Sequence, residues 1–94
     1  MSGADVGVHI FVAGRVQGVG FRYFVVHEAE RLGARGIVRN MPDRRVEVRA
    51  EGTRSSLEAL VEAVQSGPTL ASVLATDVRW VDATGRFDGF RVEA

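Results

Sequence analysis

The strongest chemical signal in the chain is a segment crowded with three glycines and two arginines: Gly14-Arg15-Val16-Gln17-Gly18-Val19-Gly20-Phe21-Arg22. Glycines let consecutive backbone N–H groups turn inward, and such a concavity at the start of a helix binds a phosphate-sized anion. Arg22 falls in the first turn of the expected helix, where its planar fork of donors can reach the same anion. A cation at a helix start is otherwise unfavourable. The segment therefore predicts an anion site.

Several other kinds of site are excluded or poorly supported. The glycine spacing fits neither GxGxxG nor GxxxxGKS, so it does not favour dinucleotide or Walker-type nucleotide binding. All twelve basic residues are arginine, which removes Schiff-base chemistry, and the absence of cysteine removes thiol nucleophiles and zinc–thiolate sites. The spacing alone leaves one alternative open: the loop is only a tight connection, and Arg22 is a solvated surface residue.

The remaining polar residues give weaker signals. His9 and His27 have no second ligand at metal spacing, so they predict structural or surface roles and no metal site. Asp43 is expected to be a turn residue and Glu47 a solvated strand residue. Arg39 should point to the sheet face opposite that of Asn40, the next residue, so we leave Arg39 out of the candidate site.

Hydrophobic periodicity predicts the elements that must position the loop. Residues 8–12 indicate a central strand, and apolar residues from Phe21 to Leu32 lie on one face of a helix that Gly33 ends. A hairpin follows, with strands at 36–40 and 46–50 joined by a turn at 41–44.

The second half of the chain repeats the pattern. Ser55 and Glu58 have capping-box spacing before a second helix, which carries the apolar stripe of Leu57, Leu60, Val61 and Val64 and ends at Gly67-Pro68. Strands are expected at 74–81 and 87–92, with Trp80 and Phe90 filling the sheet. The order βαββαβ is that of an α+β, ferredoxin-like sandwich: an antiparallel sheet covered on one face by two helices, plus a short C-terminal strand.

Ninety-four residues support one hydrophobic core, so we predict a single domain at 6–94 behind an N-terminal tail at 1–5. The net charge is zero, which argues against a protein that coats nucleic acid or a membrane, although residues 35–54 carry a local excess of three positive charges. No long apolar run or signal-peptide pattern occurs, which predicts a cytoplasmic protein.

Two motifs resemble those of the acylphosphatase family, and the resemblance runs from about Val8 to Val92. The segment Gly14 to Arg22 is similar to the family's first signature. Its second signature resembles Gly36-Ile37-Val38-Arg39-Asn40, followed by Asp43 and then by Val46-Glu47. Members are small ferredoxin-like enzymes that hydrolyse carboxyl–phosphate anhydrides without a metal or other cofactor.

The resemblance implies roles for particular residues. Arg22 would bind the phosphoryl group and Asn40 would position the attacking water. The loop amides would complete the phosphate cradle, which comprises Arg15, Val16, Gln17, Gly18, Val19 and Gly20. The expected partners are an acyl phosphate and inorganic phosphate as product and inhibitor, with no nucleic acid and no membrane, and the expected state is a monomer.

The chain departs from the family pattern at three places. Ile37 stands where an aromatic residue is usual, Arg44 stands in place of the usual turn glycine, and the C-terminal residues 90–94 lack a tyrosine. If Arg44 adopts the positive φ of a turn glycine, the strain is about 1 to 2 kcal/mol; otherwise the turn has changed type.

The hydrolysis of an acyl phosphate, which the resemblance implies, needs few catalytic groups. The leaving carboxylate has a conjugate acid of pKa about 4, so it departs without a general acid. What remains is to neutralise the phosphoryl oxygens and to hold a water in line, with the substrate phosphate accepting the water's proton.

Two non-catalytic alternatives share the predicted fold. An RNA-binding module of the RRM type is disfavoured because its third strand would carry aromatic residues, which the stretch 45–49 lacks. The other alternative is a module that senses phosphate-bearing ligands without turnover. Retention of Asn40 beside Arg22 favours catalysis, since simple anion binding needs no water-positioning amide.

Overall fold

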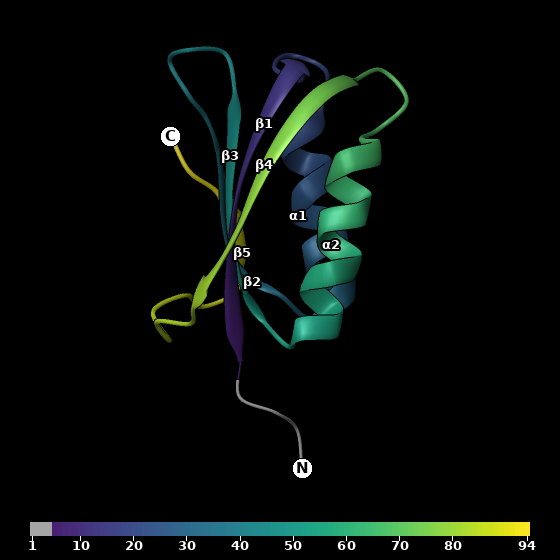
Figure 1. Ribbon diagram of the computed structural model, residues 1–94. Coiled ribbons are helices and arrows are strands. Elements are labelled where there is room, and N and C mark those ends of the chain that lie inside the picture. The colour runs from purple at the N-terminus through teal and green to yellow at the C-terminus, as the bar shows by residue number, and fades with distance from the viewer. Residues whose placement is uncertain (1–4) are drawn as a thin grey trace.

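The computed structural model describes residues 5–94, which form a five-stranded sheet with two helices packed on one face (Figure 1). The elements follow the chain in the order β1 (Val6–Arg15), α1 (Phe21–Leu32), β2 (Arg35–Asn40), β3 (Val46–Gly52), α2 (Arg54–Ser66), β4 (Ser72–Asp82) and β5 (Phe90–Val92). The predicted βαββαβ order with a short C-terminal strand is therefore confirmed. The predicted boundary between a tail and a domain stays a prediction, because residues 1–4 lie outside the described residues; Asp5 forms an ion pair with Arg35.

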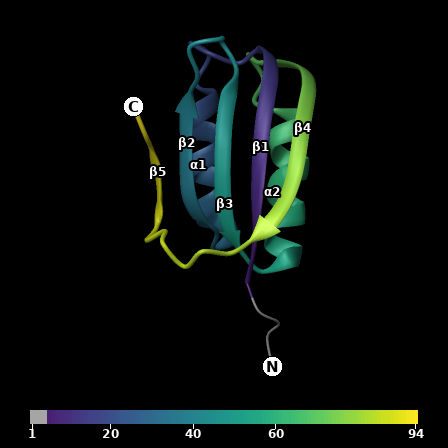
Figure 2. The ribbon, with the colours of Figure 1, turned by 60° about the vertical axis from the view of Figure 1, so that its left-hand side comes forward.

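The strands β1 and β3 lie side by side in the sheet. The strand order is β4-β1-β3-β2-β5, which Figure 2 shows face on with both helices behind the sheet. β1 pairs antiparallel with β3 and β4, and β2 pairs antiparallel with β3. β5 is shorter than predicted and adds to the edge of β2 as a parallel strand.

The core fills the space between the sheet and the helices. Alternate residues of β1 and β3 meet one apolar stripe from each helix, as the periodicity predicts. These fully buried side chains are Val8, Ile10, Val12, Val46, Val48, Phe21, Val25, Leu57, Leu60 and Val64. Phe90 is buried against the same core, whereas Trp80 is half-buried and stacks on the guanidinium of Arg54, 3.8 Å from its ring centre.

The predicted capping box at the start of α2 is wrong. Helix α2 begins at Arg54, and its N-cap is Thr53, whose side-chain oxygen accepts a hydrogen bond from the backbone N–H of Ser56 at 3.2 Å. Glu58 pairs with Arg54 instead of reaching back to the cap. The reason is that β3 runs to Gly52, so the chain leaves the sheet and turns into the helix at Thr53, two residues before Ser55.

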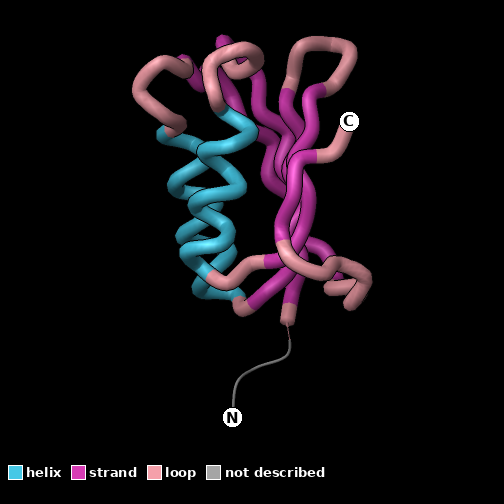
Figure 3. Tube along the Cα trace, turned by 180° about the vertical axis from the view of Figure 1, so that it is seen from behind, coloured by secondary structure: helices cyan, strands magenta, loops and turns pink. Residues whose placement is uncertain are grey.

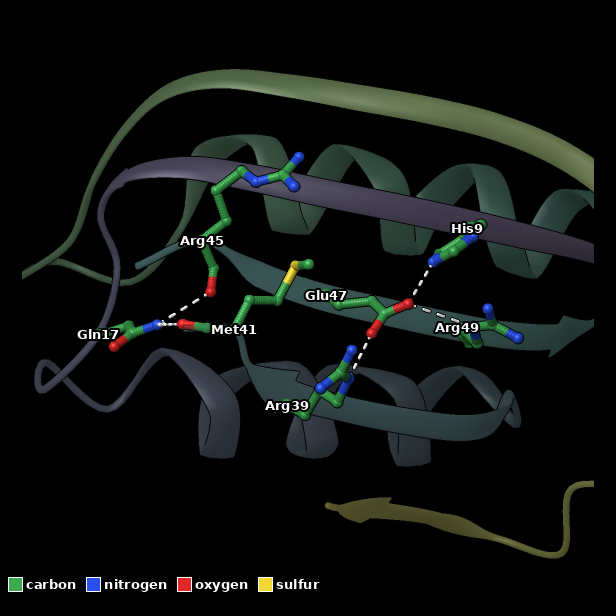
Figure 4. A network of polar contacts seen from close by, with 7 residues as sticks. All are labelled: His9, Gln17, Arg39, Met41, Arg45, Glu47 and Arg49. Atoms are coloured by element: carbon green, nitrogen blue, oxygen red, sulfur yellow. Dashed lines mark hydrogen bonds and ion pairs between the residues drawn. The ribbon is translucent and has the colours of Figure 1, made fainter. Parts of the chain in front are cut away.

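Glu47 is not the solvated strand residue that its position in an alternating strand predicts. Only 5% of Glu47 is exposed, although it lies on the sheet face away from the helices. Its carboxylate contacts His9 at 2.5 Å, Arg39 at 2.5 Å and Arg49 at 3.3 Å (Figure 4). Because β3 lies between β1 and β2, long side chains from both neighbours cover the carboxylate. His9 thus has a structural contact, in agreement with its predicted role.

A second carboxylate, that of Glu51, holds the connection between β4 and β5. It accepts hydrogen bonds from the backbone N–H of Thr84 at 2.7 Å, the Thr84 hydroxyl at 2.8 Å and the backbone N–H of Gly85 at 3.0 Å. Glu51 is 3% exposed. An otherwise irregular connection is thereby anchored to a central strand.

Both glutamates should make the fold sensitive to acid. Burial acts to raise the pKa of Glu47, but hydrogen bonds from Arg39 and His9 outweigh it and hold the pKa below its ordinary value. For Glu51, hydrogen bonds from Thr84 and Gly85 likewise outweigh burial and lower the pKa. A carboxyl whose pKa is lower in the folded chain stabilises the fold above its unfolded pKa, and this contribution disappears as pH falls through the folded pKa.

We therefore expect the free energy of unfolding, measured by urea titration, to fall steadily below about pH 5. Glu47→Gln and Glu51→Gln should each lose about 1 to 3 kcal/mol at pH 7 and flatten this acid dependence. Glu58→Gln, at an exposed helical position, is the matched control and should leave the pH profile unchanged. Equal acid sensitivity in all four proteins would contradict the assignment.

Candidate active site

The loop between β1 and α1 begins at a distortion of the central strand. A β-bulge between Ala13 and Gly14 shifts the register of β1 against β4. Gly14 has φ 132°, and a Cβ there would lie 2.2 Å from the carbonyl oxygen of Ser72. Only glycine fits so close to β4, so this residue fixes the direction in which the loop leaves the sheet.

The loop residues divide into an anchor and an exposed arc. Val16 is fully buried in the core, Gln17 and Val19 are half-buried, and Arg15, Gly18 and Gly20 are exposed. The Val16 side chain thus anchors the loop to the core, while Arg15, Gly18 and Gly20 face the solvent. This arrangement leaves the backbone around the two glycines accessible to a ligand.

The start of α1 differs from the start of α2 in a way that suits an anion. The N-cap of α1 is Gly20 in the left-handed conformation, φ 79°, and within the described residues no side chain caps this helix. Its first turn holds no acidic residue and contains Arg22, which is half-buried. By contrast, Thr53 caps α2. The free N–H groups of the first turn of α1 therefore remain available to an external acceptor.

The side chain of Gln17 joins the two motifs that lie far apart in the sequence. Its Nε2 donates hydrogen bonds to the carbonyl oxygens of Met41 at 3.0 Å and Arg45 at 2.9 Å (Figure 4). These carbonyls belong to the turn between β2 and β3, which lies beside the loop at one end of the sheet (Figure 3). The sequence predicts that Gln17 contributes its backbone amide to the cradle, but it does not predict this bridge. A long amide between two loop glycines is the only local signal for it.

Asn40 occupies the last position of β2, next to that turn. Within residues 5–94, one buried side-chain oxygen has no hydrogen-bond partner, and it is Oδ1 of Asn40. A buried carbonyl oxygen without a partner is uncommon in folded proteins. Its lone pairs are free to accept a hydrogen bond from a water or a ligand.

The β2–β3 turn keeps the geometry of a glycine turn although it contains Arg44. Arg44 has φ 76° and is the one non-glycine residue with a positive φ within residues 5–94. Its N–H donates to the Met41 carbonyl at 3.1 Å, and Met41 N–H donates to the Arg45 carbonyl at 2.8 Å. Asp43 accepts from the backbone N–H of Arg45 at 3.1 Å and from its Nε at 2.8 Å, which confirms Asp43 as a turn residue. The turn has therefore not changed type, and Arg44 carries the strain.

Among residues 5–94, no three histidine or carboxylate side chains gather at metal-binding distances. No helix in the described part of the chain is long and apolar enough to cross a membrane. The structure thus brings the loop, Arg22 on α1 and the turn after Asn40 to one end of the sheet, and leaves Arg39 and Glu47 on the outer face.

The chain as a whole also matches known proteins. The family model described as acylphosphatase matches residues 8–92. The chain belongs to the acylphosphatase family. It is 48% identical to an acylphosphatase of Salinibacter ruber over 97% of this chain and 96% of the relative, and 49% identical to one of Methylococcus capsulatus over 90% and 92%.

Solved structures of the family agree with the fold. The crystal structure of an acylphosphatase from Bacillus subtilis superimposes with a TM-score of 0.91 at 39% identity, covering 95% of this chain and 99% of that one. An acylphosphatase from Coxiella burnetii gives a TM-score of 0.85 at 35% identity, covering 96% and 94%. The chain is thus a hydrolase of acyl phosphates with the ferredoxin-like fold of its family. The alternatives of a sensing module and an RRM-type module are not supported.

Proposed function

We propose that the enzyme hydrolyses acyl phosphates by in-line attack of a water held by Asn40 on a phosphoryl group held by the β1–α1 loop. The observation that carries this proposal is the buried, unpartnered Oδ1 of Asn40, which lies at the end of β2 where Gln17 fastens the following turn to the loop. A buried acceptor with a free lone pair can orient a water that an anion-binding loop alone would leave mobile.

The phosphoryl oxygens would bind at the exposed arc of the loop. The amides from Arg15 to Gly20 and the positive end of α1 would supply preorganised donors, and Arg22 would add the planar donor fork of its guanidinium. Preorganised donors stabilise the charge that develops on the phosphoryl oxygens in the transition state. This placement also predicts that inorganic phosphate, the product, binds as an inhibitor.

The proposed reaction needs no acid or base from the protein. The water oxygen bonds to phosphorus, the bond between phosphorus and the acyl oxygen breaks, and its electron pair leaves with the carboxylate. Asn40 is too weak a base to take the water's proton, so a phosphoryl oxygen of the substrate accepts it. A rate that does not change across the ionisation of the substrate phosphate would contradict this proton transfer.

Hydrolysis of benzoyl phosphate in ¹⁸O-labelled water, with excess EDTA present, tests the route. We expect full turnover and one labelled oxygen in the inorganic phosphate, detected by mass spectrometry. Label in the benzoate instead would mean that water attacks the carbonyl carbon, which would overturn the role of the loop. Loss of activity in EDTA would overturn the metal-independent route.

We further propose that the enzyme acts as a cytoplasmic monomer, with residues 6–94 as one catalytic domain. The support for the monomer is that few large apolar side chains among residues 5–94 are exposed to solvent; they are Tyr23, Leu70, Leu74 and Val81. The support for the location is that the sequence contains no cysteine, whereas secreted domains of this size commonly rely on disulfides.

A further inference from the structure

A hollow of about 200 Å³ opens beside the proposed phosphate loop. It is lined by Gly14, Arg15, Val16, Gln17 and Arg44. Gly14 and Arg15 end β1, Val16 and Gln17 belong to the β1–α1 loop, and Arg44 comes from the β2–β3 turn. The proposed mechanism places the phosphoryl group on the loop amides but uses neither the hollow nor the side chains of the two arginines.

The two arginines that line the hollow differ from others nearby. Arg45 pairs with Asp43, and Arg39 pairs with Glu47. Among the ion pairs formed within residues 5–94, none includes Arg15 or Arg44, and both side chains are exposed. Two arginines without an ion pair among residues 5–94 therefore line one small hollow, which favours an anionic group there.

Arg44 is held at the hollow by the backbone and not by its own side chain. Its φ of 76° is strained for an arginine, by about 1 to 2 kcal/mol, and the turn retains it because Gln17 hydrogen-bonds the carbonyls of Met41 and Arg45 on either side. The same hydrogen bonds fix the turn against the loop. The backbone of Arg44 is thus fixed relative to the phosphate cradle before substrate binds.

We propose that Arg44 and Arg15 form an acyl-side subsite, which favours acyl phosphates whose acyl group carries a second negative charge, a carboxylate or a phosphate. The inference rests on the proposed placement of the phosphoryl group in the loop. With that group on the amides around Gly18 and Gly20, an acyl chain directed into the hollow would lie beside Arg15 and Arg44, which line it. Arg44 then selects among substrates and takes no part in the chemical step.

A matched pair of substrates tests the subsite: 4-carboxybenzoyl phosphate and 4-methylbenzoyl phosphate, which differ in charge at the far end of the acyl group. The measured quantity is the ratio of kcat/KM for the charged substrate to that for the neutral one. Arg44→Asn removes the charge yet tolerates a positive φ, Arg44→Gly relieves the strain, and Arg44→Lys keeps the charge. Arg91→Asn, at an exposed position on the edge strand β5, makes the same change in net charge far from the loop.

We expect the ratio to fall about two- to fivefold in Arg44→Asn and Arg44→Gly, the range that one solvent-screened ion pair supports. The ratio should be kept in Arg44→Lys and Arg91→Asn, and raising the salt concentration should lower it in the wild type. Turnover of the neutral substrate should be unchanged in every variant.

An unchanged ratio in both Arg44→Asn and Arg44→Gly would overturn the subsite, and so would an equal loss on both substrates. Failure of the loop placement itself has a different signature. In that case Arg22→Ala would keep its activity on the neutral substrate, whatever the ratio does in the Arg44 variants.

Discussion

Replacing Arg22 by alanine should lower kcat for benzoyl phosphate by at least about 10²- to 10³-fold, the loss typical of removing one charge-stabilising donor. Arg22 lies in the first turn of α1, a helix start with no capping side chain among the described residues and no acidic neighbour. The guanidinium and the helix amides would act on the same phosphoryl oxygens. Inhibition by inorganic phosphate should weaken in parallel, because the product presents the same oxygens.

Arg22→Ala should not lower the stability of the fold. A cation at a helix N-terminus is destabilising by a few tenths of a kcal/mol to about 1 kcal/mol, so Arg22→Ala should leave the free energy of unfolding unchanged or slightly higher. Arg31→Ala, an exposed position in the last turn of the same helix, is the matched control and should retain full activity. A folded Arg22→Ala protein that binds phosphate as tightly as the wild type would remove Arg22 from the site.

Replacing Asn40 by alanine should lower kcat by about 10²-fold, the scale expected when a reacting group loses its alignment. KM and the inhibition constant of phosphate should change little, because the water that Asn40 would hold does not bind the anion. The kinetic signature thus differs from that of Arg22→Ala, which should alter kcat and phosphate affinity together. A collapse of phosphate affinity would make Asn40 a binding residue instead.

A stability measurement separates this role from a structural one. Oδ1 of Asn40 is buried without a partner within residues 5–94, so deleting it breaks no hydrogen bond to the protein at that atom. We expect the free energy of unfolding of Asn40→Ala to equal that of the wild type or to exceed it, since an unsatisfied buried acceptor is itself destabilising. Gln17→Ala is the contrast, because it removes two hydrogen bonds and should be destabilised. A large loss of stability in Asn40→Ala would mean that the amide is structural.

Local patterns were sufficient for most of the architecture. The two helices carry apolar stripes at helical spacing, and Gly33 ends α1 with φ 75° as predicted. In β1, the buried residues Val8, Ile10 and Val12 alternate with half-buried ones, as the period of two predicts. These features depend on residues a few positions apart, so a sequence read in short windows contains them.

Two predictions were wrong, the solvated Glu47 and the capping box of α2, and both failed for the same reason. The burial of Glu47 depends on His9 and Arg39, which are 38 and 8 residues away, and becomes visible only once β3 lies between β1 and β2. The N-cap of α2 is Thr53 and not the predicted Ser55, because pairing with β1 extends β3 as far as Gly52. In both cases tertiary pairing overrode a local preference.

The sequence by itself determined the fold, the family and the residue types of the site, because glycine spacing, apolar periodicity and the two signatures are local properties. Only the tertiary structure decided how the site is assembled. It alone places Gln17 across the turn that follows Asn40, leaves one amide oxygen of Asn40 unpartnered, and turns the strained Arg44 toward the loop. The physical reason is that these contacts join segments more than twenty residues apart, and their geometry exists only after β1, β2 and β3 have paired.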